Sequence, residues 1–151
     1  MKLVSSGHIN IATESFGDPS HPALVMIMGA TASMLGWPDE LCVRLADAGL
    51  FVIRFDHRDT GQSTTVLPGA ADYAVEDMAD DVMAIFDAYC LGSAHLAGMS
   101  LGGYIAQMAA LMWPARVQSL TLIGSGPLGW DGLPLPPISD GFLAHFGALD
   151  G

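Results

Sequence analysis

The stretch that decides the fold is Gly98-Met99-Ser100-Leu101-Gly102-Gly103. A short apolar segment at 94–97 precedes it, and a long apolar segment at 101–113 follows. The pattern G-x-S-x-G marks a sharp strand-to-helix turn that lifts a serine hydroxyl above the edge of a sheet. Glycine is needed at 98 and 102, because a side chain in so tight a turn would collide with the neighbouring strand or helix. The stretch therefore predicts Ser100 as a nucleophile.

A dinucleotide-binding turn is the competing interpretation, since Gly98-x-Ser100-x-x-Gly103 resembles G-x-G-x-x-G. The middle glycine, which lets a pyrophosphate approach the backbone, is replaced here by Ser100. No acidic residue occurs in 117–123, about 20 residues further on, where a ribose ligand would be expected. The nucleotide interpretation is therefore set aside, and no cofactor is expected.

Apolar runs and helical periods alternate along the rest of the chain. Strands are expected at 9–16, 23–28, 50–55, 94–97 and 117–123, the last four of them buried. Helices are expected at 38–48, 75–89 and 101–113. The acidic residues of the second helix should form a solvated face: Glu76, Asp77, Asp80, Asp81 and Asp87. The alternation indicates an α/β fold with a mostly parallel sheet and Ser100 at its carboxyl edge.

Two other segments support a site at that edge. Met28-Gly29-Ala30 follows an expected strand, where a glycine-containing loop should supply one N–H of an oxyanion hole. The second donor would be the N–H of Leu101, directly after the nucleophile and at a helix N-terminus. Asp56 to Ser63 follows another strand, and its His57-Arg58-Asp59 invites a comparison with kinases, which fails for want of the other kinase motifs. We expect Arg–carboxylate hydrogen bonds to hold that loop together.

Composition excludes several classes of protein. The 151 residues carry 5 Lys plus Arg and 16 Asp plus Glu, a formal net charge of -11, with no basic cluster for nucleic acid or an anionic membrane. The longest apolar run is far shorter than the roughly 20 residues of a membrane span, and no signal-peptide core is present. Cys42 and Cys90 lack metal-ligand spacing, so no metal site is expected. These features predict a cytoplasmic protein with buried, reduced thiols.

At this point the chain resembles the α/β-hydrolase superfamily. The resemblance rests on Gly29, on D-x-R-x-x-G-x-S at 56–63 and on the turn at 98–102. Within the superfamily, Met28-Gly29, Gly36-Trp37-Pro38-Asp39 and Asp56 to Gly61 are similar to the aclacinomycin methylesterase-like serine esterases. That resemblance implies a carboxylesterase with Ser100 as nucleophile, Ala30 and Leu101 as backbone donors, and a helical cap. Residues 1–124 would be the N-terminal half of the core, and 125–151 the irregular start of the cap.

The acid and the base of a catalytic triad are missing from this pattern. The family orders its triad as Ser, then Asp or Glu, then His, on later strands of the sheet. His145 with Asp131 or Asp140 imitates that order, but no strand is expected to carry them. His57 and His95 precede Ser100, and packing explains them better. Because open sheets of this plan commonly run to roughly 200–250 residues, we expect the acid and base to lie outside a truncated chain that is nearly inert alone.

Several alternatives remain open from the sequence. The leading interpretation is an esterase acting on a small-molecule ester. A non-catalytic hydrolase-fold protein that binds a ligand or partner, or a cofactor-free perhydrolase or haloperoxidase, would share the same motifs. Gly29 is expected to contact substrate, and Met34, Trp37, Met99 and Trp130 either line an apolar cleft or pack in the core. The expected polypeptide partner is the missing C-terminal half or a second copy of the chain, because strand 117–123 has nothing left in this chain to pair with.

Overall fold

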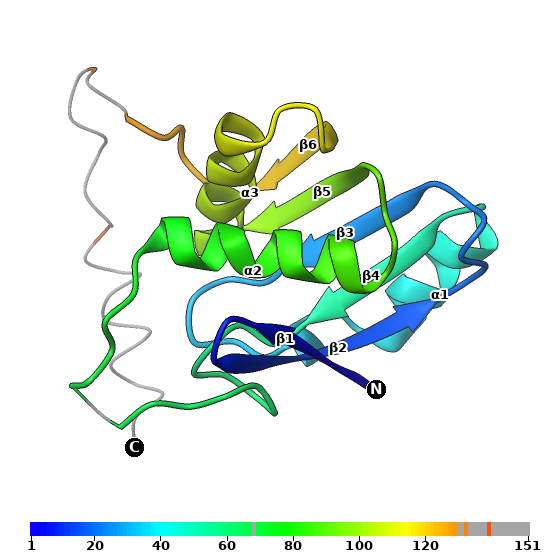
Figure 1. The fold of residues 1–151 in the computed structure, drawn as a ribbon. Helices are drawn as coiled ribbons and strands as arrows, with labels where there is room; N and C mark the ends of the chain where they lie inside the picture. Colours follow the sequence, from blue (N-terminus) through cyan, green and yellow to red (C-terminus); the bar gives the residue numbers. More distant parts are fainter. Residues whose placement is uncertain (68, 130–131, 133–138, 140–151) are drawn as a thin grey trace.

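The structure is a computed structural model that describes residues 1–67, 69–129, 132 and 139. Its sheet has six strands (Figure 1). In spatial order they are β1 (Lys2–Ser6), β2 (Ile9–Phe16), β4 (Phe51–Phe55), β3 (Ala23–Ile27), β5 (Ala94–Met99) and β6 (Val117–Ile123). The helices are α1 (Asp39–Asp47), α2 (Val75–Ala88) and α3 (Leu101–Met112), with a 3-10 turn at Met34–Gly36. The α/β fold predicted from the sequence is confirmed.

The four strands predicted to be parallel are parallel. β3 pairs with β4 and β5, and β5 pairs with β6, so the carboxyl ends of all four lie at one edge of the sheet. β5 runs past the expected end at Ala97, because Gly98 stays in register with Ile27 on one side and Leu122 on the other. The strand therefore continues to Met99 and delivers Ser100 directly at that edge.

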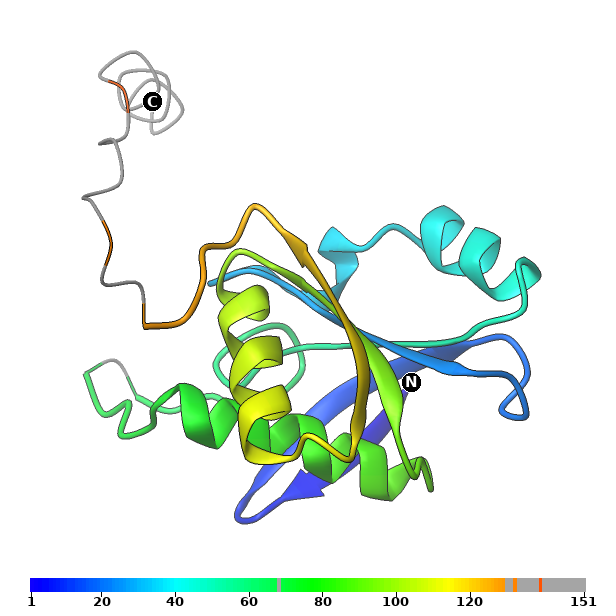
Figure 2. The same cartoon turned by 90° about the horizontal axis from the view of Figure 1, so that it is seen from above.

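Helices cover both faces of the sheet, α1 on one side and α2 with α3 on the other (Figure 2). Successive residues of the central strands alternate between two buried clusters, as the period of a strand requires. Val25 and Ile27 join the larger cluster under α2 and α3, whereas Met26 joins the smaller one with Trp37 and Cys42. Burial on both faces explains why these strands are continuous apolar runs in the sequence.

The first hairpin strand, β1, was not predicted from the sequence. It pairs antiparallel with β2, and Gly7 provides the turn with a φ of +58°. Val4 is buried, while Leu3 is 57% exposed, so the strand has little apolar signal of its own. Its extended conformation depends on pairing with β2, and the residues of β1 show little preference for it by themselves.

Three expectations about burial were wrong. Asp81 lies on the α2 face that was expected to be solvated, yet it is buried, because α2 also packs beside Arg58. Cys90 follows α2 with a φ of +56° and is exposed, while Cys42 is buried as expected. β6 was expected to be buried, but Leu120, Leu122 and Ile123 are 37–41% exposed. In the described part of the chain, β6 is an edge strand that pairs with β5 alone.

The exposed β6 edge leads to a prediction about the 151-residue chain expressed alone. We expect it to elute as oligomers in size-exclusion chromatography with light scattering, because β6 carries no charged residue to block strand pairing. The variant Leu120→Lys places a charge on that edge and should shift the distribution towards monomer. A monodisperse monomer at tens of micromolar for the unchanged chain would contradict the prediction.

Within the described residues, no helix has both the length and the apolar character needed to cross a membrane. The segment predicted to begin the cap, 125–151, lies mostly outside the described residues. Trp130, Asp131, Asp140 and His145 are among the residues outside the described part.

Candidate active site

Ser100 occupies the turn between β5 and α3 in a conformation that serine seldom adopts. Its φ is +50° and its ψ is -116°, and its side chain is exposed. The turn is fixed on both sides, because the Ser100 N–H donates to the Ile123 carbonyl and the Gly103 N–H donates to the Ser100 carbonyl, each at 2.9 Å. Strained backbone of this kind persists where the surroundings over-determine it, and it concentrates at functional sites.

Two glycines make the turn possible, as the sequence predicted. A Cβ atom on Gly98 would lie 2.2 Å from the Gly102 carbonyl oxygen. A Cβ atom on Gly102 would lie 2.2 Å from the Ile27 carbonyl oxygen, at the end of β3. Both contacts are to backbone, which cannot swing aside like a side chain. Helix α3 can therefore start directly against β3 only with glycine at these positions.

We expect Gly102→Ala to lower the free energy of unfolding by about 2 kcal/mol, since overpacking a tight contact commonly costs 1–3 kcal/mol. The measurement is urea denaturation at one fixed protein concentration. Gly92→Ala is the matched control, because a Cβ atom there would have nothing within 4 Å. Equal effects of the two substitutions would show that the close approach to β3 does not constrain the turn.

The loop after β3 lies against Ser100. A Cβ atom on Gly29 would be 3.4 Å from the Ser100 Cβ, an ordinary van der Waals distance, so this buried glycine lies directly against the serine. The Met34 N–H donates to Asp56 Oδ1 at 2.7 Å, and the Met28 carbonyl lies 2.7 Å from His57 Nε2. The loop is thus tied at both of its ends to residues that follow β4.

Ala30 and Leu101 line a common cavity of about 220 Å³ beside this loop. Leu101 is the first residue of α3, whose N–H has no acceptor within the helix. In the part of the chain that the structure describes, neither the Ala30 nor the Leu101 N–H donates a backbone hydrogen bond. Two open backbone donors next to an exposed, strained serine can bind an oxygen that carries developing negative charge.

The loop after β4 is held by carboxylates, although not in the way expected. Asp56 accepts from the Met34 and Gln62 N–H groups, and Gly61 leaves room for it. The guanidinium of Arg58 binds both carboxylate oxygens of Asp81 at 2.8 Å, so its partner lies on α2 and not within the loop. These bonds fix one wall of the cavity.

Among the described residues, the two histidines nearest to Ser100 in the sequence form hydrogen bonds with other groups. His57 is buried, and burial lowers its imidazole pKa despite the hydrogen bond to Met28. Because the Met28 carbonyl can only accept, Nε2 of His57 carries the proton and donates it there. His95 lies 2.8 Å from the Ser119 Oγ, between β5 and β6. Both histidines thus have packing or structural partners.

The predicted site residues fall into two groups. Gly29, Ala30, Ser100 and Leu101 come together at the carboxyl edge of the sheet. Trp37 is buried with Met26, Cys42 and Val52 under α1, and Met99 packs against the same cluster. Met34 is buried as well. Sequence reasoning missed Thr31, Tyr73 and Met78, which also line the cavity, because a turn and an amphipathic helix gave no signal that they would face Leu101.

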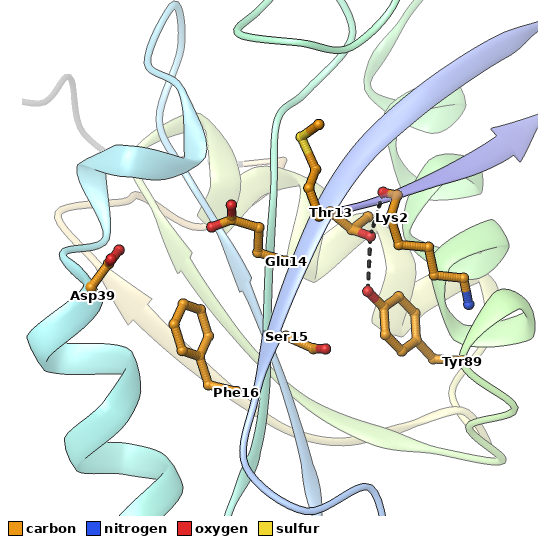
Figure 3. A pocket seen from close by; sticks show the side chains of 8 residues that line it. Lys2, Thr13, Glu14, Ser15, Phe16, Asp39 and Tyr89 are labelled. Carbon is orange, nitrogen blue, oxygen red and sulfur yellow. Dashed lines mark hydrogen bonds between the residues drawn. The ribbon is translucent and has the colours of Figure 1, made fainter.

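A larger cavity, of about 430 Å³, lies along β2 and is shown in Figure 3. Its wall includes Tyr89, whose hydroxyl is 2.9 Å from Thr13 Oγ1. Its two carboxylates, Glu14 and Asp39, are both paired with Arg54. Neither Ala30 nor Leu101 lines this cavity, and it is therefore not the candidate active site.

Comparison with known proteins agrees with this geometry. A family described as alpha/beta hydrolase fold matches residues 22–141 of the chain. The chain belongs to this family.

Relatives and solved structures extend the comparison. Rhodomycin D methylesterase DauP of Streptomyces sp. (strain C5) is 40% identical over 130 residues, which are 86% of this chain and 44% of DauP. A putative carbamate hydrolase RutD of Variovorax paradoxus (strain S110) is 39% identical over 112 residues, 74% of this chain and 41% of RutD. A crystal structure of a hydrolase from Pseudomonas aeruginosa PA01 superposes with a TM-score of 0.76 at 26% identity, covering 87% of this chain and 48% of that one. The chain spans less than half the length of these proteins.

Proposed function

We propose that this chain carries the nucleophile and the oxyanion hole of a serine hydrolase that cleaves carboxylic esters. The observation that carries the proposal is Ser100 in a strained turn beside the open N–H groups of Ala30 and Leu101. The name of the relative DauP supports a methyl ester as the substrate class. Gly29 belongs to the same site, since it lies directly against Ser100.

In the proposed mechanism, Ser100 Oγ bonds to the ester carbonyl carbon while a base takes the hydroxyl proton. The Ala30 and Leu101 N–H groups hold the oxygen that becomes negative. When the carbonyl re-forms, the bond to the alkoxy group breaks, and the protonated base returns its proton to the leaving methanol. Water then attacks the acyl-serine by the same route, which releases the acid and restores the serine.

The base is proposed to lie outside the described residues, since His57 and His95 are engaged elsewhere. An alcohol without an adjacent base is a weak nucleophile at neutral pH. The 151 residues alone should therefore react slowly. In a chimaera with DauP, the base would be supplied by the part of DauP that has no match in this chain.

A fluorophosphonate probe followed by peptide mass spectrometry tests the proposal. It is applied to the 151-residue chain and to a chimaera in which this chain's matched residues replace those of DauP. We expect strong labelling of Ser100 in the chimaera and weak labelling in the chain. Strong labelling of the chain would place a base within it and point to His145. An active chimaera with no label on Ser100 would overturn the assignment, and a folded chimaera without activity would favour the non-catalytic alternative.

A further inference from the structure

The cavity beside the two open donors has a wall that the proposed mechanism does not use. Besides Ala30 and Leu101, it is lined by Tyr73 and by Met78 at the start of α2. Its volume of about 220 Å³ corresponds to about seven water molecules in the liquid, which suits a phenyl ring or a short alkyl chain. A group bound here would lie directly next to the oxyanion donors.

Unusual backbone conformations surround this cavity. Among the described residues, the non-glycine residues with positive φ are Thr31, Asp59, Cys90 and Ser100. Thr31 and Asp59 line the cavity, and Ser100 directly precedes Leu101. A β-branched threonine at a φ of +61° is a clear outlier. The strain is thus concentrated where a ligand would bind, as it is at many functional sites.

Tyr73 is fixed in place as a wall of the cavity. Its hydroxyl donates to Asp59 Oδ2 at 2.6 Å, and the other oxygen of Asp59 accepts from the Val66 N–H at 2.6 Å. The guanidinium of Arg58 lies over the ring, with its Cζ 4.8 Å from the centroid. The ring is therefore anchored at its hydroxyl and supported by a cation, and it offers a rigid aromatic surface.

The charges in the wall are already matched. Arg58 is paired with Asp81, which holds the pKa of the guanidinium above its usual range. The Tyr73 hydroxyl and the Val66 N–H lower the pKa of the Asp59 carboxyl, which therefore stays ionised, with one hydrogen bond to each of its oxygens. The charges of Arg58 and Asp59 are thus already stabilised by these partners. A charged group in the cavity would give up its hydration for groups that are already partnered, whereas an uncharged group would lose little hydration.

We propose that Tyr73, positioned by Asp59, is the specificity-determining wall of an acyl pocket that selects an uncharged aromatic or short apolar group. The proposal rests on the proposed function, in which a methyl ester leaves only the acyl side for a group of this size. Asp59 is a positioning residue: it acts through Tyr73 and tolerates the left-handed conformation better than most residues.

The first test compares kcat/KM for methyl phenylacetate, methyl acetate and methyl hydrogen malonate, in whichever form Ser100 is active. The unchanged protein should prefer methyl phenylacetate and should use the charged malonate poorly. Tyr73→Ala should reduce the preference for phenylacetate over acetate about tenfold, the scale of discrimination by apolar pockets. Asp59→Ala should move the preference in the same direction. Asp59→Asn should restore it only in part, because its single amide oxygen can accept from the Tyr73 hydroxyl or from the Val66 N–H but not from both.

Tyr89→Phe is the matched control. It removes a phenol hydrogen bond of similar length in the cavity of Figure 3, away from Ser100, and should leave the preference unchanged. If Tyr73→Ala changes activity on all three esters equally, the wall does not determine specificity, although the serine hydrolase assignment stands.

The second test needs no catalysis. Saturation-transfer NMR of phenylacetamide with the 151-residue chain, a method that tolerates oligomers, should show transfer to the ring protons. Tyr73→Ala should abolish this signal, and Tyr89→Phe and Ser100→Ala should retain it. Binding that survives Tyr73→Ala would overturn the inference, whereas binding that depends on Tyr73 without any hydrolysis in the chimaera would overturn the proposed function alone.

Discussion

Replacing Ser100 with alanine is expected to lower the rate of ester hydrolysis by the chimaera about a million-fold, or about 8 kcal/mol of barrier lowering. The reason is that the serine, its base and its acid act as a unit, so loss of the nucleophile removes almost the whole effect of the triad. A residual acceleration of roughly a thousandfold over water should remain from the oxyanion donors and from binding. Hydrolysis of a methyl ester under saturating substrate is the measurement.

Ser119→Ala is the control for this prediction. Among the described residues, the Ser119 hydroxyl, unlike that of Ser100, lies 2.8 Å from a histidine ring nitrogen, Nδ1 of His95, but Ser119 is on β6 and not in the strained turn. We expect Ser119→Ala to leave the rate within a factor of about two, as is usual for substitutions away from a reacting centre. A Ser100→Ala variant that keeps a tenth or more of the rate would rule out Ser100 as the nucleophile.

Replacing Asp81 with alanine is expected to produce the largest loss of stability among the carboxylates of α2, about 3 kcal/mol. The side chain of Asp81 is 2% exposed and that of Arg58 is 13% exposed, so the substitution would leave a buried guanidinium without its counter-charge. The cost of such an unpaired buried charge exceeds the small net value of the intact pair. Urea denaturation at one protein concentration measures the change, because association also contributes to apparent stability.

Asp80→Ala removes the same charge from the neighbouring, exposed position of α2 and serves as control. It should change the free energy of unfolding by no more than about 0.5 kcal/mol. If Asp80→Ala and Asp81→Ala had equal effects, the pair with Arg58 would not contribute to stability. Because Arg58 lies over the Tyr73 ring, Asp81→Ala should also weaken the preference for phenylacetate.

Some features of the candidate site depend only on residues that are close together in the sequence. The glycines at 98 and 102 and the serine between them occur within five residues, so the turn and the exposed hydroxyl could be predicted from spacing. The parallel strands were predictable for a similar reason, since burial on both faces removes the polar residues from each strand. The steric requirement of the turn and the burial of the strands both act on consecutive residues, so both can be recognised in the sequence.

The other parts of the site depend on residues that are far apart in the chain. The sequence assigned Asp81 to a solvated face because its neighbours Asp77 and Asp80 are acidic, and only packing of α2 beside Arg58 buries it. Tyr73 faces Leu101 because Asp59, in a left-handed conformation, accepts its hydroxyl. β1 has too few apolar residues to be predicted as a strand, and it forms one because it pairs with β2.

For this protein, then, the sequence by itself determined the parallel strands, the sharp turn and the serine exposed on it, because each follows from sterics and hydrophobic period over a few consecutive residues. The tertiary structure decided which backbone groups lie beside Ser100, which carboxylate pairs with Arg58, and which aromatic ring lines the cavity. These are matters of distance between separate elements. They depend on how β3, β4, α2 and α3 pack together, and spacing along the chain does not encode that packing.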